Sequence, residues 1–133
     1  MAQLNKIAAN PSFEIESHTF WHPNFKTEKK HLDGSSYPLF VNTQLERSKD
    51  VLSRELDRPI DLLAWPFGIY DPFLISRASA AGYGAAFSIE CRAAKESDPL
   101  MSIPRCLVAD EYVGTRFPSF MRAAISSAGN NND

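Results

Sequence analysis

Two histidines, His18 and His22, stand four positions apart in the stretch ESHTFWHP. If this segment forms a helical turn, side chains at this spacing lie on one face, and two imidazole nitrogens can then bind one zinc-sized ion. A histidine pair can equally be structural, because imidazoles often only satisfy hydrogen bonds. Spacing alone therefore leaves both interpretations open. The third histidine, His31, follows two lysines and is expected to be exposed.

A second stretch whose residues could take part in binding or catalysis is LAWPFGIYD, residues 63–71. An apolar run enters Pro-Phe-Gly, which predicts a sharp turn with Trp65, Phe67 and Tyr70 near the end of a strand. In parallel α/β proteins ligands bind at the carboxyl edge of the sheet, and exposed aromatic rings there suit the flat faces of sugars. The same residues could instead be core aromatics beside a turn.

Short strands are predicted at four places along the chain. Residues 13–17 alternate apolar and polar side chains, so the histidine pair follows the carboxyl end of a strand. Residues 60–65 form an apolar run between two prolines, which is typical of a buried strand. Further strands are expected at residues 83–89 and 102–108.

Helices are predicted between these strands. The pattern indicates a short helix within residues 2–9, a helix from Thr43 that ends before Pro59, a third over residues 73–81 and a last one over 117–126. Residues 23–41 contain several prolines, serines and a glycine and are expected to be a long loop. Strands alternating with helices predict an α/β fold with a mainly parallel sheet.

The bulk properties fit one domain. The chain has 133 residues, which favours one domain over residues 1–126, with a disordered tail at 127–133. A net charge of -2 and no basic stripe exclude nucleic acid as a favoured partner. No apolar run could span a membrane, and no signal peptide is visible, so the sequence as given is expected to be cytoplasmic. Cys91 and Cys106 are expected to be free, buried or half-buried thiols.

Residues 2–90 resemble the polysaccharide deacetylase family, the metal-dependent carbohydrate esterases that deacetylate chitin, peptidoglycan and poly-N-acetylglucosamine. The motif H-[ST]-x-x-H, followed by proline, appears as HTFWHP at residues 18–23. A motif centred on Pro-[Tyr/Phe]-Gly appears as WPFG at residues 65–68. The stretch AGYGAAFS at residues 81–88 is also similar to the family. The resemblance rests on these motifs in this order.

The resemblance implies roles for particular residues. His18 and His22 would bind a divalent metal, most simply zinc, and the backbone amide of Phe67 would stabilise the oxyanion. Thr19 would brace the loop between the two histidines. The substrate would be an N-acetylated polysaccharide or oligosaccharide. Positions expected to contact it are Trp21, Trp65, Pro66, Tyr70 and Asp71.

Two parts of the family pattern are absent. The first family motif carries paired aspartates that supply a metal ligand and the catalytic base, but this chain has no Asp-Asp pair. The family's proton donor is a late histidine, and none follows His31. The chain therefore resembles the later part of a deacetylase domain. Its expected fold is an incomplete or distorted (β/α) barrel, which predicts self-association or a missing N-terminal segment. Proteins of this family often act outside the cytoplasm.

Two functions from different classes follow. The first is a metal-dependent hydrolase that removes N-acetyl or O-acetyl groups from a polysaccharide, with this chain as a truncated domain. The alternative is a non-catalytic remnant, or a saccharide- or metal-binding module, with the same fold. The catalytic base and acid cannot be assigned to residues of this chain. Arg105, which follows Pro104, is either structural or substrate-facing.

Overall fold

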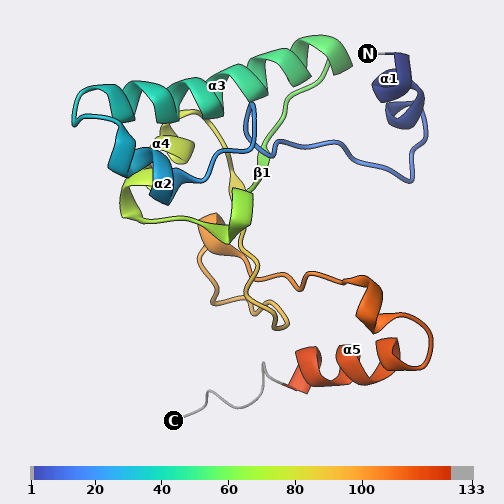
Figure 1. Cartoon of the computed structure of the whole chain (residues 1–133). Helices are drawn as coiled ribbons and strands as arrows, with labels where there is room; N and C mark the ends of the chain where they lie inside the picture. The colour runs from blue at the N-terminus through green and yellow to red at the C-terminus, as the bar shows by residue number, and fades with distance from the viewer. Residues whose placement is uncertain (1, 127–133) are drawn as a thin grey trace.

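The computed structural model describes residues 2–126 (Figure 1). Within them lie short strands, α-helices and 3-10 turns. The helices are α1 (Ala2–Ala8), α2 (Phe25–His31), α3 (Ser36–Leu56), α4 (Pro72–Ala80) and α5 (Arg116–Ser126). The strands are β1 (Leu62–Ala64) and β2 (Ala85–Phe87), and the 3-10 turns are η1 (Pro66–Gly68), η2 (Leu100–Ser102) and η3 (Asp110–Tyr112).

The sheet is parallel and small. Strands β1 and β2 pair with Leu63 opposite Ala86. Parallel bridges extend this pair on both sides, from Ser17 to Leu63 and from Phe87 to Ile103. The strands predicted at residues 13–17 and 102–108 are therefore reduced to single bridges. A mixed fold with a parallel sheet is confirmed, whereas closure into a barrel stays a prediction.

The loop predicted over residues 23–41 is wrong, because α2 and the first turn of α3 occupy most of it. Asn24 caps α2 by accepting a hydrogen bond from the Thr27 amide at 3.2 Å. Pro38 lies in the first turn of α3, where a missing N–H removes no hydrogen bond within the helix. The prolines and serines in this region therefore mark helix starts. Helix α3 begins at Ser36, earlier than the predicted Thr43.

The core lies between α3, α4 and the sheet (Figure 1). Helix α4 begins as predicted, with the Asp71 side chain accepting from the Leu74 amide at 2.8 Å and Pro72 at the first helical position. It ends just before Gly82, which has φ +83°. The buried apolar residues are Phe25, Tyr37, Val41, Leu45, Ile60, Leu63, Trp65, Leu74, Ala78, Tyr83 and Ala86.

The two ends of the described chain carry the predicted helices α1 and α5. Helix α5 lies at the opposite end of the molecule from α3 (Figure 1). Several of its apolar side chains are exposed, including Phe117, Met121 and Ile125. No helix within residues 2–126 is long and apolar enough to cross a membrane. The tail predicted at residues 127–133 lies outside the described residues.

Cys91 and Cys106 form a disulfide, so the prediction of two free thiols is wrong. The bridge between Phe87 and Ile103 explains the pairing. Two parallel segments that are adjacent at these residues continue side by side, which brings Cys91 and Cys106 together a few residues later. The disulfide closes the loop between the two segments.

Within this loop, Arg92 and Asp98 form a bidentate ion pair with N–O distances of 2.8 and 2.6 Å. The Lys95 amide also donates to the Asp98 carboxylate at 2.7 Å. These hydrogen bonds, of which that from Arg92 has the largest effect, lower the pKa of Asp98 from 3.8 to about 2. The contacts therefore favour the ionised carboxylate.

We expect the ordering of this loop to depend on pH in acid. A lowered folded-state pKa gives a stabilisation that is complete above the unfolded value of 3.8 and is lost as the pH falls through about 2. An NMR titration of the Asp98 carboxyl carbon measures this directly, and Asp98→Asn should remove the transition. A midpoint near 3.8 would show that the ion pair does not hold in solution.

Candidate metal centre

The structure brings His18 and His22 together. Their ring centroids lie 4.7 Å apart in an edge-to-face arrangement, and both side chains are exposed to solvent. His18 follows Ser17, whose main chain pairs with β1, so the pair lies at the carboxyl end of the parallel segments. His31 is exposed on α2, as predicted.

The ring of His18 is held by the main chain. Its Nδ1 lies 2.7 Å from the carbonyl oxygen of Ala64. Because a carbonyl can only accept, Nδ1 must carry the proton and donate it. In the neutral form of the ring, this arrangement leaves the electron pair on Nε2. Histidines that bind metals in proteins commonly donate their other ring N–H to a carbonyl or carboxylate in this way.

The segment between the histidines is a bend with strained backbone, not the helical turn that the spacing suggested. Thr19 has φ +66° and His22 has φ +58°, both in the left-handed region. Such conformations cost about 1 to 3 kcal/mol each in residues other than glycine and persist only where neighbours hold them. Strain at the two ends of this segment is therefore a feature of the site.

Three main-chain amides of the bend have acceptors, one on the preceding residues and two on α3. The Thr19 amide donates to the Ser17 hydroxyl at 3.3 Å. The Phe20 amide donates to the Gln44 carbonyl oxygen at 3.0 Å, and the Trp21 amide to Gln44 Oε1 at 3.1 Å. Sequence analysis missed Gln44, although a glutamine on the apolar face of a helix is itself a signal.

The Thr19 hydroxyl does not make the brace that the resemblance implies. Its oxygen is buried and has no hydrogen-bond partner within residues 2–126. The bend is held instead through main-chain amides, by Ser17 and Gln44. Thr19 therefore contributes its backbone conformation to the site.

The Pro-Phe-Gly turn forms the other wall of the site. Phe67 has φ +55°, and its ring lies 4.5 Å from the ring of His22, centroid to centroid. Gly68 follows with φ +63°, and a Cβ there would come within 2.4 Å of Ile89. No acceptor within the described residues binds the Phe67 amide, which was the predicted oxyanion donor.

The expected exposure of Trp65 is wrong. Its side chain is 0% exposed, and its indole N–H donates to the Met101 carbonyl at 2.9 Å. Pro66 is also buried, so neither side chain is available to a substrate. The core interpretation, which the sequence left open, applies to Trp65. Trp21 by contrast is 57% exposed.

Tyr70, Asp71 and Arg105 make contacts within the protein. Tyr70 donates to Glu90 at 2.6 Å, and this hydrogen bond, with burial, raises the pKa of Tyr70. Asp71 caps α4 and pairs with Lys29 at 3.1 Å. Its carboxyl pKa is lowered because the hydrogen bonds from α4 and Lys29 outweigh the effect of burial. Arg105 donates to the Ser88 carbonyl at 2.9 Å and is exposed, so its structural and substrate-facing interpretations both stay predictions.

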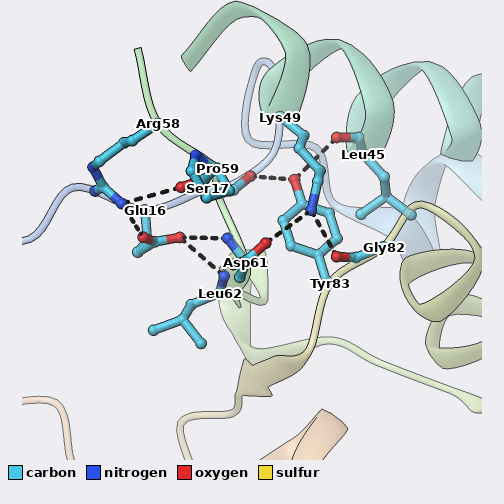
Figure 2. A network of polar contacts seen from close by, with 10 residues as sticks. All are labelled: Glu16, Ser17, Leu45, Lys49, Arg58, Pro59, Asp61, Leu62, Gly82 and Tyr83. Atoms are coloured by element: carbon cyan, nitrogen blue, oxygen red, sulfur yellow. Dashed lines mark hydrogen bonds and ion pairs between the residues drawn. The ribbon is translucent and has the colours of Figure 1, made fainter. Parts of the chain in front are cut away.

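A polar network fixes Glu16 and Ser17, the two residues before His18 (Figure 2). The Tyr83 hydroxyl lies 2.8 Å from Ser17 Oγ and 3.0 Å from the Leu45 carbonyl. Ser17 Oγ also lies 2.9 Å from Ser48 Oγ. Burial raises the pKa of Tyr83, so its hydroxyl keeps its proton. Beside it, Glu16 binds Arg58 and two main-chain amides at the start of β1 (Figure 2).

An open groove of about 420 Å³ lies beside His18. Its lining includes Glu14, Glu16, Phe87 and Arg105. No group of three metal-binding side chains occurs within the described part of the chain. The two histidines are the candidate metal ligands, and the described residues supply no third.

The sequence comparison decides the family. The family model of the polysaccharide deacetylases matches residues 1–86, which include both histidines and the Pro-Phe-Gly turn. The chain belongs to the polysaccharide deacetylase family. No curated protein matches the sequence significantly.

Solved structures with the same fold are deacetylases. A de-N-acetylase from Aggregatibacter actinomycetemcomitans is 18% identical with a TM-score of 0.71, covering 90% of this chain and 52% of its own. The deacetylase PplD from Streptococcus pyogenes, solved with acetate, is 21% identical with a TM-score of 0.65, covering 80% and 43%. The Bacillus cereus polysaccharide deacetylase BC0361 is 18% identical with a TM-score of 0.65, covering 90% and 35%. This chain of the polysaccharide deacetylase family thus spans about half or less of the length of each of these proteins.

Proposed function

We propose that this chain supplies the two-histidine part of a metal-dependent deacetylase site that acts on acetylated polysaccharide. The observation that carries the proposal is the contact between His18 and His22, with Nδ1 of His18 donating to the Ala64 carbonyl. That hydrogen bond leaves Nε2 of His18 free to bind a metal. Family membership supports the reaction class.

The metal would be a divalent ion, with zinc the first choice, because imidazole nitrogens are common zinc ligands. When bound, the ion would supply a Lewis acid for the acetyl carbonyl oxygen. Catalytic zinc usually has three protein ligands, and the described residues bring two candidate ligands together. The third ligand and the catalytic base would come from outside the described residues or from a second copy of the chain.

The chain's own residues would bind and orient the substrate. Trp21 and Phe67 are 57% and 53% exposed. Trp21 lies in the bend between the histidines and Phe67 lies against the His22 ring, and both rings would stack on sugar faces. The Phe67 amide, which has no acceptor within the described residues, would donate to the oxyanion. The substrate would be an N-acetylated, or O-acetylated, polysaccharide or oligosaccharide.

A non-catalytic saccharide- or metal-binding module is the second candidate. It is favoured by the missing third ligand and by the absence of an assignable base among residues 2–126. Such a module would bind saccharide through Trp21 and Phe67 and release no acetate. The two functions therefore differ in turnover rather than in binding.

We expect slow acetate release from N-acetylated chitooligosaccharide by the purified chain with zinc, and a higher rate when formate is added. A small carboxylate can take the place of the missing aspartate, whereas a site without its base loses about 10²-fold or more in rate. The assay measures acetate, with His22→Ala as the control that should fall to background. No release with any metal or carboxylate, combined with saccharide binding, would favour the second candidate.

A further inference from the structure

We propose that Gln44 is a positioning residue for His18 and His22. From the buried side of α3 it holds the segment that joins the two histidines. The inference rests on the proposed function in one respect, namely that this pair binds the metal. Gln44 itself would contact neither metal nor substrate, and would act through the conformation of the bend.

The contacts of Gln44 are directed at the bend. Its side chain is 1% exposed, and its Oε1 accepts from the Trp21 amide at 3.1 Å. Its carbonyl oxygen accepts from the preceding amide, that of Phe20, at 3.0 Å. Two consecutive amides between the histidines are therefore bound by a single residue of another element.

The position of Gln44 on α3 argues for a specific role. Its neighbours on the buried face are Val41, Leu45 and Ser48. A glutamine buried among apolar side chains loses its hydration and its rotamer freedom, so it is rare there unless its polar atoms are satisfied. Here the side-chain oxygen is satisfied by the Trp21 amide.

The contact with Trp21 lies next to the strained residue His22. His22 holds φ +58°, a conformation that persists only when neighbours fix it. Without an acceptor, the Trp21 amide would turn toward solvent, and the backbone at His22 could relax. The His22 ring would then move away from the rings of His18 and Phe67, whose centroids lie 4.7 and 4.5 Å from its own. Metal affinity would fall because the two imidazoles no longer converge.

The test uses three single variants of the full chain. Gln44→Met has a similar length and volume but no acceptor, while Gln44→Glu keeps an acceptor oxygen. Val41→Ala is the matched control, because Val41 is buried on the same face of α3 and its apolar side chain cannot bind an amide of the bend. Zinc affinity is measured by calorimetry. Hydrogen exchange at the Trp21 amide is measured without zinc, and thermal unfolding reports stability.

We expect Gln44→Met to weaken zinc binding about 10-fold to 100-fold, the range seen for residues that orient metal ligands, and to accelerate exchange at the Trp21 amide. The zinc affinity of Gln44→Glu should stay within about 3-fold of that of the wild type. Val41→Ala should lower stability while zinc affinity stays within about 2-fold. If Gln44→Met does not fold, Gln44→Leu replaces it.

Two results would overturn the proposal. In the first, Gln44→Met binds zinc like the wild type and its Trp21 amide exchanges at the wild-type rate. In the second, Val41→Ala weakens zinc binding as much as Gln44→Met, which would reduce Gln44 to a stability residue. If the wild-type chain binds no zinc, the proposed function fails separately, and exchange at the Trp21 amide still decides whether Gln44 holds the bend.

Discussion

Replacing both His18 and His22 with alanine is expected to lower zinc affinity by about 100-fold or more. The two imidazole rings lie 4.7 Å apart, centroid to centroid, and no group of three metal-binding side chains exists within residues 2–126 to take their place. The wild-type chain should bind one zinc ion with a dissociation constant on the order of micromolar, because two protein ligands and water complete the coordination.

A zinc titration by calorimetry at neutral pH measures this effect. His31→Ala is the matched control, since His31 is exposed on α2 and outside the pair, and its loss should leave the affinity unchanged. The single variants should each lose most of the binding. His18→Ala also removes the hydrogen bond to Ala64, and His22→Ala removes the ring contact with Phe67. Equal binding by the wild type and the double variant would place the ion elsewhere and refute this metal centre.

The parts of the site that the sequence predicted are local. The histidine pair and the Pro-Phe-Gly turn are each contained in a few consecutive residues, so residue type and spacing indicate them directly. The start of α4 at Asp71 and Pro72 is local in the same sense, since a cap and a proline at the first position act within one turn.

The features that the sequence did not predict depend on contacts between distant residues. Trp65 is buried because its indole meets the Met101 carbonyl, which lies 36 residues further along the chain. The disulfide depends on a parallel bridge between Phe87 and Ile103, which spacing between cysteines cannot reveal. Pro38 was interpreted as a loop residue, although proline is equally compatible with the first turn of a helix.

Gln44 belongs to the same group of long-range features. Its part in the site depends on where α3 places it relative to the bend, 23 residues earlier in the chain at Trp21. The sequence predicts a helix that begins at Thr43, one residue before Gln44. The apolar face that contains Gln44 therefore could not be recognised from its first turn. An accurate helix start would have placed a glutamine on an apolar face and raised the question of its partner.

Replacing Glu16 with glutamine is expected to destabilise the fold by about 2 to 3 kcal/mol. Glu16 Oε1 accepts from Arg58 at 2.9 Å, while Oε2 accepts from the amides of Asp61 and Leu62 at 3.0 and 2.9 Å (Figure 2). A glutamine has one acceptor oxygen, so its NH2 group would face one set of these donors. Urea unfolding measures the difference in the free energy of unfolding.

Glu14→Gln provides the control for this measurement. Glu14 lies two residues earlier on the same segment and is exposed, so its replacement should change the free energy of unfolding by less than about 0.5 kcal/mol. Arg58 also donates to the Ile15 carbonyl, so Glu16 and Arg58 together tie this segment to the start of β1. Because His18 follows on that segment, Glu16→Gln should also weaken zinc binding. Equal stability of the two variants would mean that Ser17 and Tyr83 hold the segment without the carboxylate.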